Sequence, residues 1–228
     1  MTQKKNEFGY EKKSDTIIVC VHDLFSDPIA FESLSRICKK QLPYSFVSFR
    51  LLGHGCDIKQ LYGYTYYDYE MQLLTYLKFL ATKYKRILLV GSGFGAVLCV
   101  DVSFYENVQK VVILNPPRKP TIRLRIVRAF ATIMPSLQIP LSLSGYVQKS
   151  TSKMYAQSSI VLFESYSQWK KMTLSKKCIV CIEKNHPIYT KKDSTKYSVH
   201  TIDTTFSRDL QICDLLTDST KHSFSLKR

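Results

Sequence analysis

One segment in the first half of the chain has the composition of a tight functional turn. Residues 91–96 read GSGFGA and join an apolar run at 87–90 to a stretch with the pattern of a helix. A sharp strand-to-helix turn can present a serine hydroxyl as a nucleophile, or can direct backbone N–H groups at a phosphate. The segment has neither the lysine of a phosphate-binding loop nor the first-strand position of a dinucleotide-binding turn. Nucleophilic chemistry through Ser92 is therefore the main catalytic hypothesis for this turn, and the alternative is a small residue that caps the helix.

Three other turns carry imidazole side chains. The first contains His22, followed by Asp23 and Leu24. The second contains His54 between Gly53 and Gly55, and the third contains His186 before Pro187. Each histidine is a candidate for acid–base work, and each has a structural alternative. His22 and His54 can brace their loops by hydrogen bonding to the backbone, and His186 can be an exposed turn residue.

The elements that position these turns alternate between strand and helix. Strands are predicted at 16–21, 45–50, 87–90, 111–114, 178–182 and 197–202. The runs at 16–21 and 87–90 are typical of strands buried on both faces, whereas 45–50 alternates. A helix is predicted to begin at Thr65, with Asp68 in its first turn and Tyr69, Leu73 and Leu77 on one face. Further helices are predicted after residue 28, after the turn at 91–96 and at 210–216. This order predicts a mostly parallel, doubly wound α/β sheet.

Composition and cysteine usage limit the class of protein. The chain has 228 residues, 45% of them apolar, which is enough for one domain with a sizeable core. No apolar run is long enough to span a bilayer, and residues 1–15 are polar and Lys-rich, which predicts a flexible basic arm rather than a signal peptide. Seven cysteines lie mostly in apolar runs, which is typical of reduced thiols in a cytoplasmic protein.

The positive charge is concentrated in one region. The formal net charge is +15, and residues 118–196 hold 15 Lys or Arg against three acids. No acid occurs between Glu106 and Glu164. Such a field attracts an anionic membrane surface or an acidic protein, although it is also typical of a solvated basic surface. The chain lacks zinc-finger, RNA-binding and basic-zipper patterns, which argues against a nucleic-acid partner.

Residues 121–134 have the pattern of an amphipathic basic helix within a segment, 118–160, that interrupts the alternation. Ile122, Ile126, Phe130 and Ile133 are expected on one face and Arg125 and Arg128 on the other, with Arg123 as a further basic residue. Three interpretations remain open. The helix covers a pocket with its apolar face buried, or it lies in an anionic membrane interface, or it docks on an acidic partner.

The order of these landmarks resembles the α/β-hydrolase fold, most closely its single-domain esterase and monoglyceride-lipase branch. The resemblance is clear over residues 14–117 and weaker over 160–218. It rests on the strand that ends at His22, the Gly-His-Gly turn at 53–55 and the glycine-rich turn at 91–96. It implies a nucleophile elbow of the G-x-S-x-G type, a triad and an oxyanion hole.

The chain departs from this family at each catalytic position. Aligning Gly91 and Gly95 with the elbow glycines places Gly93, which has no side chain, where the family has its serine. Centring the elbow on Ser92 would instead put Phe94 where a small residue is needed. His186 stands where the family has its acid, and no histidine occurs at 203–208, where the family has its base. The usual His-Gly of the oxyanion loop is here His22-Asp23.

These departures support two hypotheses. The first is a non-catalytic binding or interaction protein with an α/β-hydrolase fold, a degenerate elbow and no cofactor or metal. The second is a divergent serine hydrolase that acts on ester or acylglycerol substrates through Ser92. Expected partners are a small apolar or acyl ligand in a pocket, and an anionic membrane or an acidic protein at the cap. The predicted organisation is an arm at 1–15 and one domain at 16–228, in the cytoplasm and peripheral at membranes.

Overall fold

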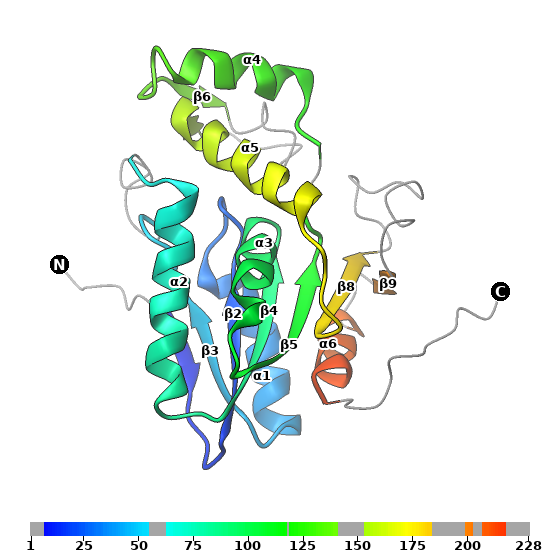
Figure 1. The fold of residues 1–228 in the computed structure, drawn as a ribbon. Helices are drawn as coiled ribbons and strands as arrows, with labels where there is room; N and C mark the ends of the chain where they lie inside the picture. Colours follow the sequence, from blue (N-terminus) through cyan, green and yellow to red (C-terminus); the bar gives the residue numbers. More distant parts are fainter. Residues whose placement is uncertain are drawn as a thin grey trace.

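Seven strands form one sheet in the order β1-β3-β2-β4-β5-β8-β9 (Figure 1). The computed structural model describes residues 7–54, 63–117, 119–140, 153–183, 199–202 and 207–217. β1 is antiparallel to its neighbour β3, and the other strands are parallel to one another. The strands are β1 (Glu7–Tyr10), β2 (Thr16–Val21), β3 (Ser45–Phe49), β4 (Arg86–Ser92), β5 (Val108–Leu114), β8 (Cys178–Glu183) and β9 (Val199–Ile202). The predicted mostly parallel sheet is confirmed.

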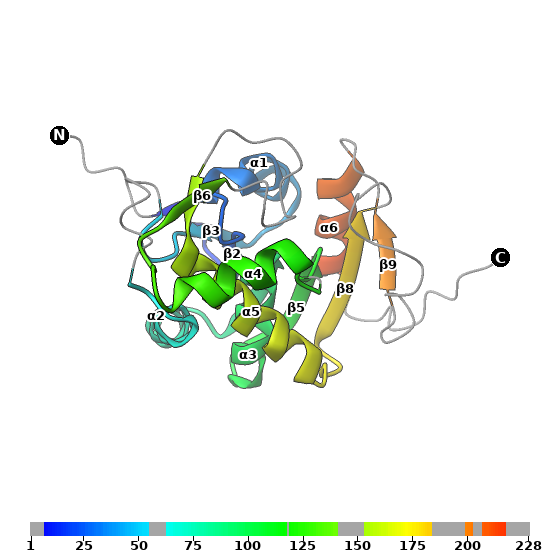
Figure 2. The same ribbon diagram turned by 90° about the horizontal axis from the view of Figure 1, so that it is seen from above.

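Helices cover both faces of the sheet, as Figure 2 shows in a view from above. α1 and α6 pack together over one face, where Ile18 and Cys20 of β2 point. α2 and α3 cover the other face, where Ile17 and Val19 point. Because alternate residues of β2 enter two separate cores, the strand is apolar throughout. The helices are α1 (Glu32–Gln41), α2 (Tyr66–Ala81), α3 (Phe94–Asp101), α4 (Ile122–Ala131), α5 (Ala156–Lys171) and α6 (Ser207–Thr217), with short 3-10 turns at Pro28–Phe31 and Val102–Phe104.

α2 begins where its sequence predicts. Thr65 accepts a hydrogen bond from the Asp68 backbone N–H, and the Asp68 carboxylate accepts one from the Thr65 N–H at 2.7 Å. This reciprocal capping satisfies two N–H groups that the first turn leaves free. Tyr69, Leu73 and Leu77 then lie buried on the face that contacts the sheet.

The N-terminal arm was predicted too long. Residues 7–10 form the edge strand β1, while residues 1–6 lie outside the described residues. Phe8 and Tyr10 alternate along β1 and pack on Phe46, with ring centroids 6.4 and 5.8 Å apart. Lys12 then donates from Nζ to the carbonyl oxygens of Lys39 and Leu42, at the end of α1. The surrounding lysines make this segment look like a solvated tail, but its alternating aromatic residues place it in the sheet.

The segment between β5 and β8 lies above the carboxyl ends of the strands (Figure 1). It contains α4, a small antiparallel pair of β6 (Gln138–Pro140) and β7 (Lys153–Tyr155), and α5. The predicted boundary at residue 160 falls inside α5, because one continuous buried face with Val161, Leu162 and Trp169 carries this helix to Lys171. Within the described residues, none of the helices has the length and apolar character needed to cross a bilayer.

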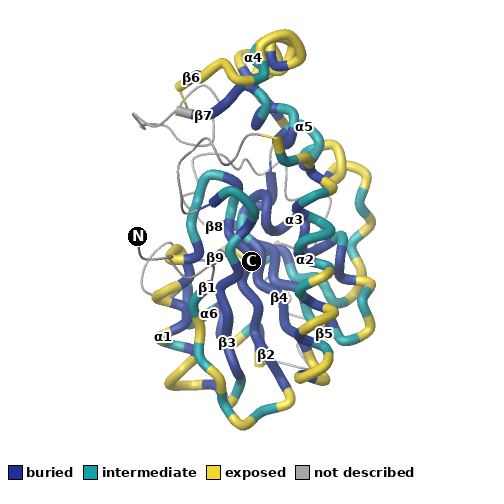
Figure 3. Tube along the Cα trace, turned by 90° about the vertical axis from the view of Figure 1, so that its left-hand side faces the viewer, coloured by how far each residue is buried: buried dark blue, intermediate teal, exposed yellow. Residues whose placement is uncertain are grey.

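α4 packs on α5, but not through the apolar face that the sequence suggests. Leu124 and Ala131 are buried, whereas Ile122, Ile126 and Phe130 are exposed. Most of the tube along α4 is coloured as exposed (Figure 3). The interpretation that this stripe is buried over a pocket is therefore wrong. The helix has two apolar sides, and the smaller one faces the protein.

The placement of β1 predicts that Tyr10 contributes to stability. We expect Tyr10→Ala to lower the free energy of unfolding by about 2 kcal/mol, because the half-buried ring packs on Phe46. The Tyr10 hydroxyl is buried and has no hydrogen-bond partner among the described residues, so Tyr10→Phe should be neutral or stabilising. Urea unfolding measures both changes. Equal stability of Tyr10→Ala and of the control Lys13→Ala would show that this segment is a flexible arm after all.

Candidate functional site

The parallel strands β2, β3, β4 and β5 end at the same edge of the sheet, and their following turns meet there. Gly93 is the residue between β4 and α3, with φ 55° and ψ −116°. Residues with a Cβ rarely adopt this conformation. An added Cβ at Gly95 would lie 2.3 Å from the Val21 carbonyl oxygen, and one at Gly91 would lie 2.5 Å from the Ala96 Cα. The glycines therefore allow a sharp turn that packs closely on β2.

Phe94 shows which register of the turn is used. Its side chain is the first in α3 and is buried between the rings of Tyr66 and Tyr69, with centroids 5.8 and 5.3 Å away. The large ring thus points toward α2, while Gly95 makes the close approach to β2. The turn is centred on Gly93, and Ser92 is the last residue of β4.

The Asp23 side chain lies directly in front of Gly93. One of its oxygens, Oδ1, accepts hydrogen bonds from the Phe94 N–H at 2.7 Å and from the Leu24 N–H at 2.8 Å. A Cβ on Gly93 would lie 2.4 Å from the Asp23 Cγ and 2.5 Å from both oxygens. Asp23 and a side chain at residue 93 therefore exclude each other.

The two N–H groups that hold Asp23 are those an acyl-transfer enzyme would use for its oxyanion. In a G-x-S-x-G elbow, the oxyanion hole consists of the N–H that follows the nucleophile and an N–H from the loop after an earlier strand. Phe94 follows Gly93, and Leu24 lies in the loop after β2. The carboxyl oxygen of Asp23 thus occupies the position where substrate charge would develop.

Burial raises the pKa of the Asp23 carboxyl group, and the hydrogen bonds from Phe94 and Leu24 oppose that change. The start of α3 adds further N–H groups that favour negative charge. Loss of the Asp23 carboxyl group would leave two converging N–H groups without their acceptor.

His22 is fully engaged by the backbone. Its Nδ1 lies 2.8 Å from the Asp23 carbonyl oxygen, and its Nε2 accepts a hydrogen bond from the Leu51 N–H at 3.2 Å. These partners require a neutral ring that carries its proton on Nδ1. Burial, together with the neighbouring His54, lowers the pKa of His22 to about 3. His22 therefore joins the loop after β2 to the loop after β3.

His54 makes a second connection between the same loops. Its Nε2 lies 2.5 Å from the Leu24 carbonyl oxygen, and its Nδ1 lies 2.8 Å from the Leu52 carbonyl oxygen. Burial lowers the pKa of His54, while hydrogen bonding to these carbonyls opposes the shift. Its ring meets that of His22 edge to face at 4.7 Å. Both histidines brace the loop that carries Asp23, which is the structural alternative considered for them above.

Ser92 lines a small cavity of about 60 Å³ beside Asp23. His22, Asn115, Arg208 and Asp209 are among the other lining residues. Among the described residues, no histidine hydrogen bonds to the Ser92 hydroxyl, and both ring nitrogens of His22 are taken by the backbone. Activation of Ser92 as a nucleophile would need such a base.

The remaining predicted site residues are distributed as follows. His186 and Gly55 lie outside the described residues, as do residues 203–206 of the segment 203–208, where the family has its base. Arg123, Arg125 and Arg128 are exposed on α4, away from the turn at Gly93. The structure brings together His22, Asp23, Leu24, Ser92, Gly93 and Phe94. The role of Asp23 was missed, although an Asp in place of the usual glycine of the loop was the available signal.

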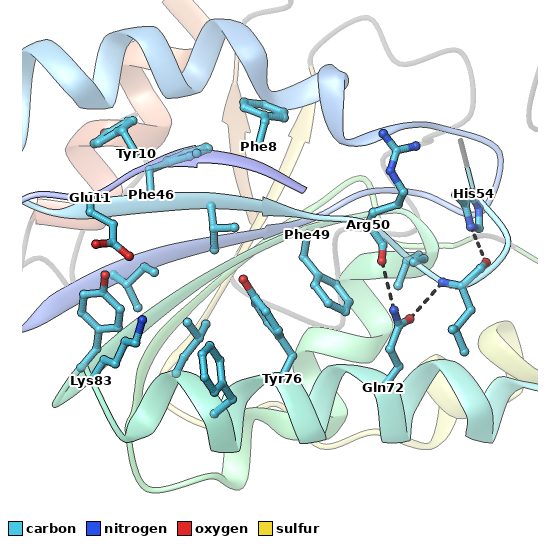
Figure 4. Close-up of a pocket in the computed structure, with 18 of the residues that line it drawn as sticks. Phe8, Tyr10, Glu11, Phe46, Phe49, Arg50, His54, Gln72, Tyr76 and Lys83 are labelled. Carbon is cyan, nitrogen blue, oxygen red and sulfur yellow. Dashed lines mark hydrogen bonds between the residues drawn. The ribbon is translucent and has the colours of Figure 1, made fainter. Parts of the chain in front are cut away.

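A larger groove opens beside the same loops. It has a volume of about 1020 Å³ and lies between β1, β3 and α2 (Figure 4). Aromatic side chains line it, among them Phe49, Tyr76 and Phe79. At one end, Gln72 fixes the loop after β3 by donating to the Arg50 carbonyl oxygen and accepting from the Leu52 N–H (Figure 4). The groove therefore ends at the loop that His54 joins to Leu24.

Solved lipolytic enzymes share this fold. A metagenome-derived lipolytic enzyme of the LipS and LipT pair is 13% identical over 92% of this chain and 95% of its own, with a TM-score of 0.72. The monoacylglycerol lipase of Paleococcus ferrophilus is 12% identical over 78% and 76%, with a TM-score of 0.60. MenH from S. aureus is 13% identical over 93% and 96%, with a TM-score of 0.58. No protein-family model and no curated protein matches the sequence. The chain has the α/β-hydrolase fold, as its resemblance implied.

The neutral state of His22 predicts a pH-dependent contribution to stability. The folded pKa of about 3 lies below the ordinary value of 6.5, so the neutral ring contributes stability that is complete above pH 6.5 and lost as the pH falls toward 3. We expect the stability advantage of the wild type over His22→Gln to shrink by roughly 1.4 kcal/mol per pH unit between about pH 6 and pH 4. Urea unfolding at several pH values measures it.

The informative quantity is the difference in the free energy of unfolding between the wild type and His22→Gln. Burial raises the pKa of Asp101 to about 6, so its protonation favours the folded state as the pH falls in this window. Burial also raises the pKa of Asp23, so its protonation acts in the same direction. Subtracting the variant from the wild type removes these contributions. A difference that stays constant with pH would mean that His22 is not held neutral.

Proposed function

We propose that this protein is a non-catalytic member of the α/β-hydrolase fold that binds a ligand or partner instead of cleaving an ester. The observation that carries the proposal is the pair of hydrogen bonds from Phe94 and Leu24 to Asp23 Oδ1, at 2.7 and 2.8 Å. These two N–H groups correspond to the oxyanion-hole donors of an acyl-transfer enzyme, and here a side chain of the protein itself binds them.

Acyl transfer needs this position for the substrate. The carbonyl oxygen of an ester becomes negative in the transition state and must be met by preorganised N–H donors. Here the donors already bind a carboxyl oxygen, which takes the space and, when ionised, repels a second negative oxygen. Gly93 supplies no nucleophile, and the carboxyl group leaves no room for a side chain there.

The surroundings of Ser92 also favour binding over hydrolysis. The adjoining cavity of about 60 Å³ has the size for one or two water molecules, whereas ligand pockets measure several hundred Å³. By contrast, the groove of about 1020 Å³ between β1, β3 and α2 has an aromatic lining that suits a small apolar or acyl ligand.

A serine-reactive fluorophosphonate probe tests the proposal. We expect no labelling of the wild type, because no base contacts Ser92 within the part of the chain that the structure describes, and no p-nitrophenyl ester turnover by Gly93→Ser or by Asp23→Ala combined with Gly93→Ser. The double variant removes the Asp23 carboxyl group as well. It would therefore gain activity if Asp23 were the only obstacle, and it would stay inactive if a base is missing. Mass spectrometry measures the labelling, and absorbance measures the ester turnover.

Ser103→Ala is the matched control for Ser92→Ala, since Ser103 is a buried serine in the 3-10 turn after α3. Labelling of the wild type that Ser92→Ala abolishes and Ser103→Ala does not would favour the divergent serine hydrolase. Turnover by Gly93→Ser well above background would reveal an active base and contradict the proposal.

A further inference from the structure

α4 exposes a continuous apolar stripe on the side that faces away from the protein. Leu124 and Ala131 point toward α5 and are buried. On the opposite side, Ile122, Ile126, Phe130 and Ile133 have 76%, 54%, 52% and 77% of their surfaces exposed. Met134 and Leu137 continue the exposed apolar surface after the helix, at 48% and 40%. Single exposed apolar residues are normal in proteins, but an aligned group of this size marks an interaction surface.

Two arginines flank the stripe. With 3.6 residues per turn, Arg123 falls on one side of the line through Ile122 and Ile126, and Arg125 falls on the other. Both are exposed. Arg128 lies closer to α5, where its guanidinium sits 4.9 Å from the centre of the Phe163 ring. A surface that contacts the stripe would therefore also contact Arg123 and Arg125.

The stripe forms a ridge at one end of the molecule. α4 lies beyond α5 and is the described helix farthest from the opposite end of the sheet (Figures 1 and 3). The side chains of the stripe are exposed, and the stripe lies apart from the groove between β1, β3 and α2. A ridge that is one helix wide can contact a planar, deformable surface into which its side chains insert.

The charge around the ridge identifies the kind of surface. No Asp or Glu occurs between residues 106 and 164, a segment that contains all of α4, β6 and β7. A helix with an apolar stripe flanked by arginines inserts its apolar residues below the headgroups while its arginines bind lipid phosphates. The same arginines would repel each other across a contact between two copies of the chain, which argues against self-association through this face.

We propose that α4, together with the residues that follow it to Leu137, docks this protein on an anionic lipid bilayer. Ile122, Ile126, Phe130 and Ile133 enter the boundary between headgroups and acyl chains. Arg123 and Arg125 bind the phosphates on either side. The proposal is independent of whether the turn at Gly93 has catalytic activity, because it rests on a different surface.

Vesicle co-sedimentation of the full chain tests this docking. We expect binding to phosphatidylcholine vesicles that contain about 30% phosphatidylserine, weak binding to phosphatidylcholine alone, and a loss of binding as salt rises from about 0.1 to about 0.5 M. Arg123→Gln combined with Arg125→Gln should weaken the partition coefficient about 30-fold, since each basic residue at such a surface contributes about fivefold. Phe130→Ser should weaken it about tenfold.

Matched controls carry the same changes elsewhere. Lys40→Gln with Lys85→Gln removes two exposed positive charges outside the ridge, and Phe104→Ser removes a phenyl ring that is 72% exposed in the turn after α3. These controls should bind like the wild type. The docking proposal is overturned if the wild type fails to bind anionic vesicles, if it binds neutral vesicles equally well, or if control and ridge variants lose binding to the same extent. An acidic protein as the true partner would give the first of these results.

Discussion

The hydrogen bonds from the backbone of Leu24 and Phe94 to the Asp23 carboxyl group are the constraint on which the rest of the site depends. They hold the loop after β2 against the start of α3, and they require a residue without a side chain at Gly93. His22 and His54 fix the same loop from behind through backbone groups of Leu24 and Leu51. Asp at residue 23 in the loop and glycine at residue 93 in the turn are thus two halves of one arrangement. At this turn the Asp23 carboxyl group binds two backbone N–H groups and fills the space in front of Gly93.

A second region of the chain has the opposite character. The backbone N–H groups at the turn at Gly93 are hydrogen-bonded within the protein, whereas α4 exposes both arginines and apolar side chains to its surroundings. Both regions lie at the end of the sheet where the parallel strands terminate (Figure 1). In this fold that end commonly carries the specific chemistry of a protein. Here that end carries the turn at Gly93 and, beyond it, the exposed surface of α4.

The sequence predicted the parts of the fold that depend on local patterns. The buried strands, the capping box of Thr65 and Asp68 and the centring of the turn on Gly93 follow from residue type and spacing. β1 was missed because its alternation of Phe8 and Tyr10 is short and lies among lysines. The contact between Asp23 and Gly93 joins residues 70 positions apart, so spacing alone did not reveal it. The sequence left the orientation of α4 open because the helix is apolar on two sides, and only packing on α5 decides which side is buried.

The most direct test of the account is a double-mutant cycle between Asp23 and Gly93. Gly93→Ala strains the backbone in any background, but only a carboxyl group at residue 23 adds a direct collision with the new Cβ. Chemical unfolding should therefore show that Gly93→Ala costs less stability in an Asp23→Ala background than in the wild type, with a coupling free energy of about 2 kcal/mol. Equal costs in the two backgrounds would contradict the account, because they would mean that Asp23 does not occupy the space in front of Gly93.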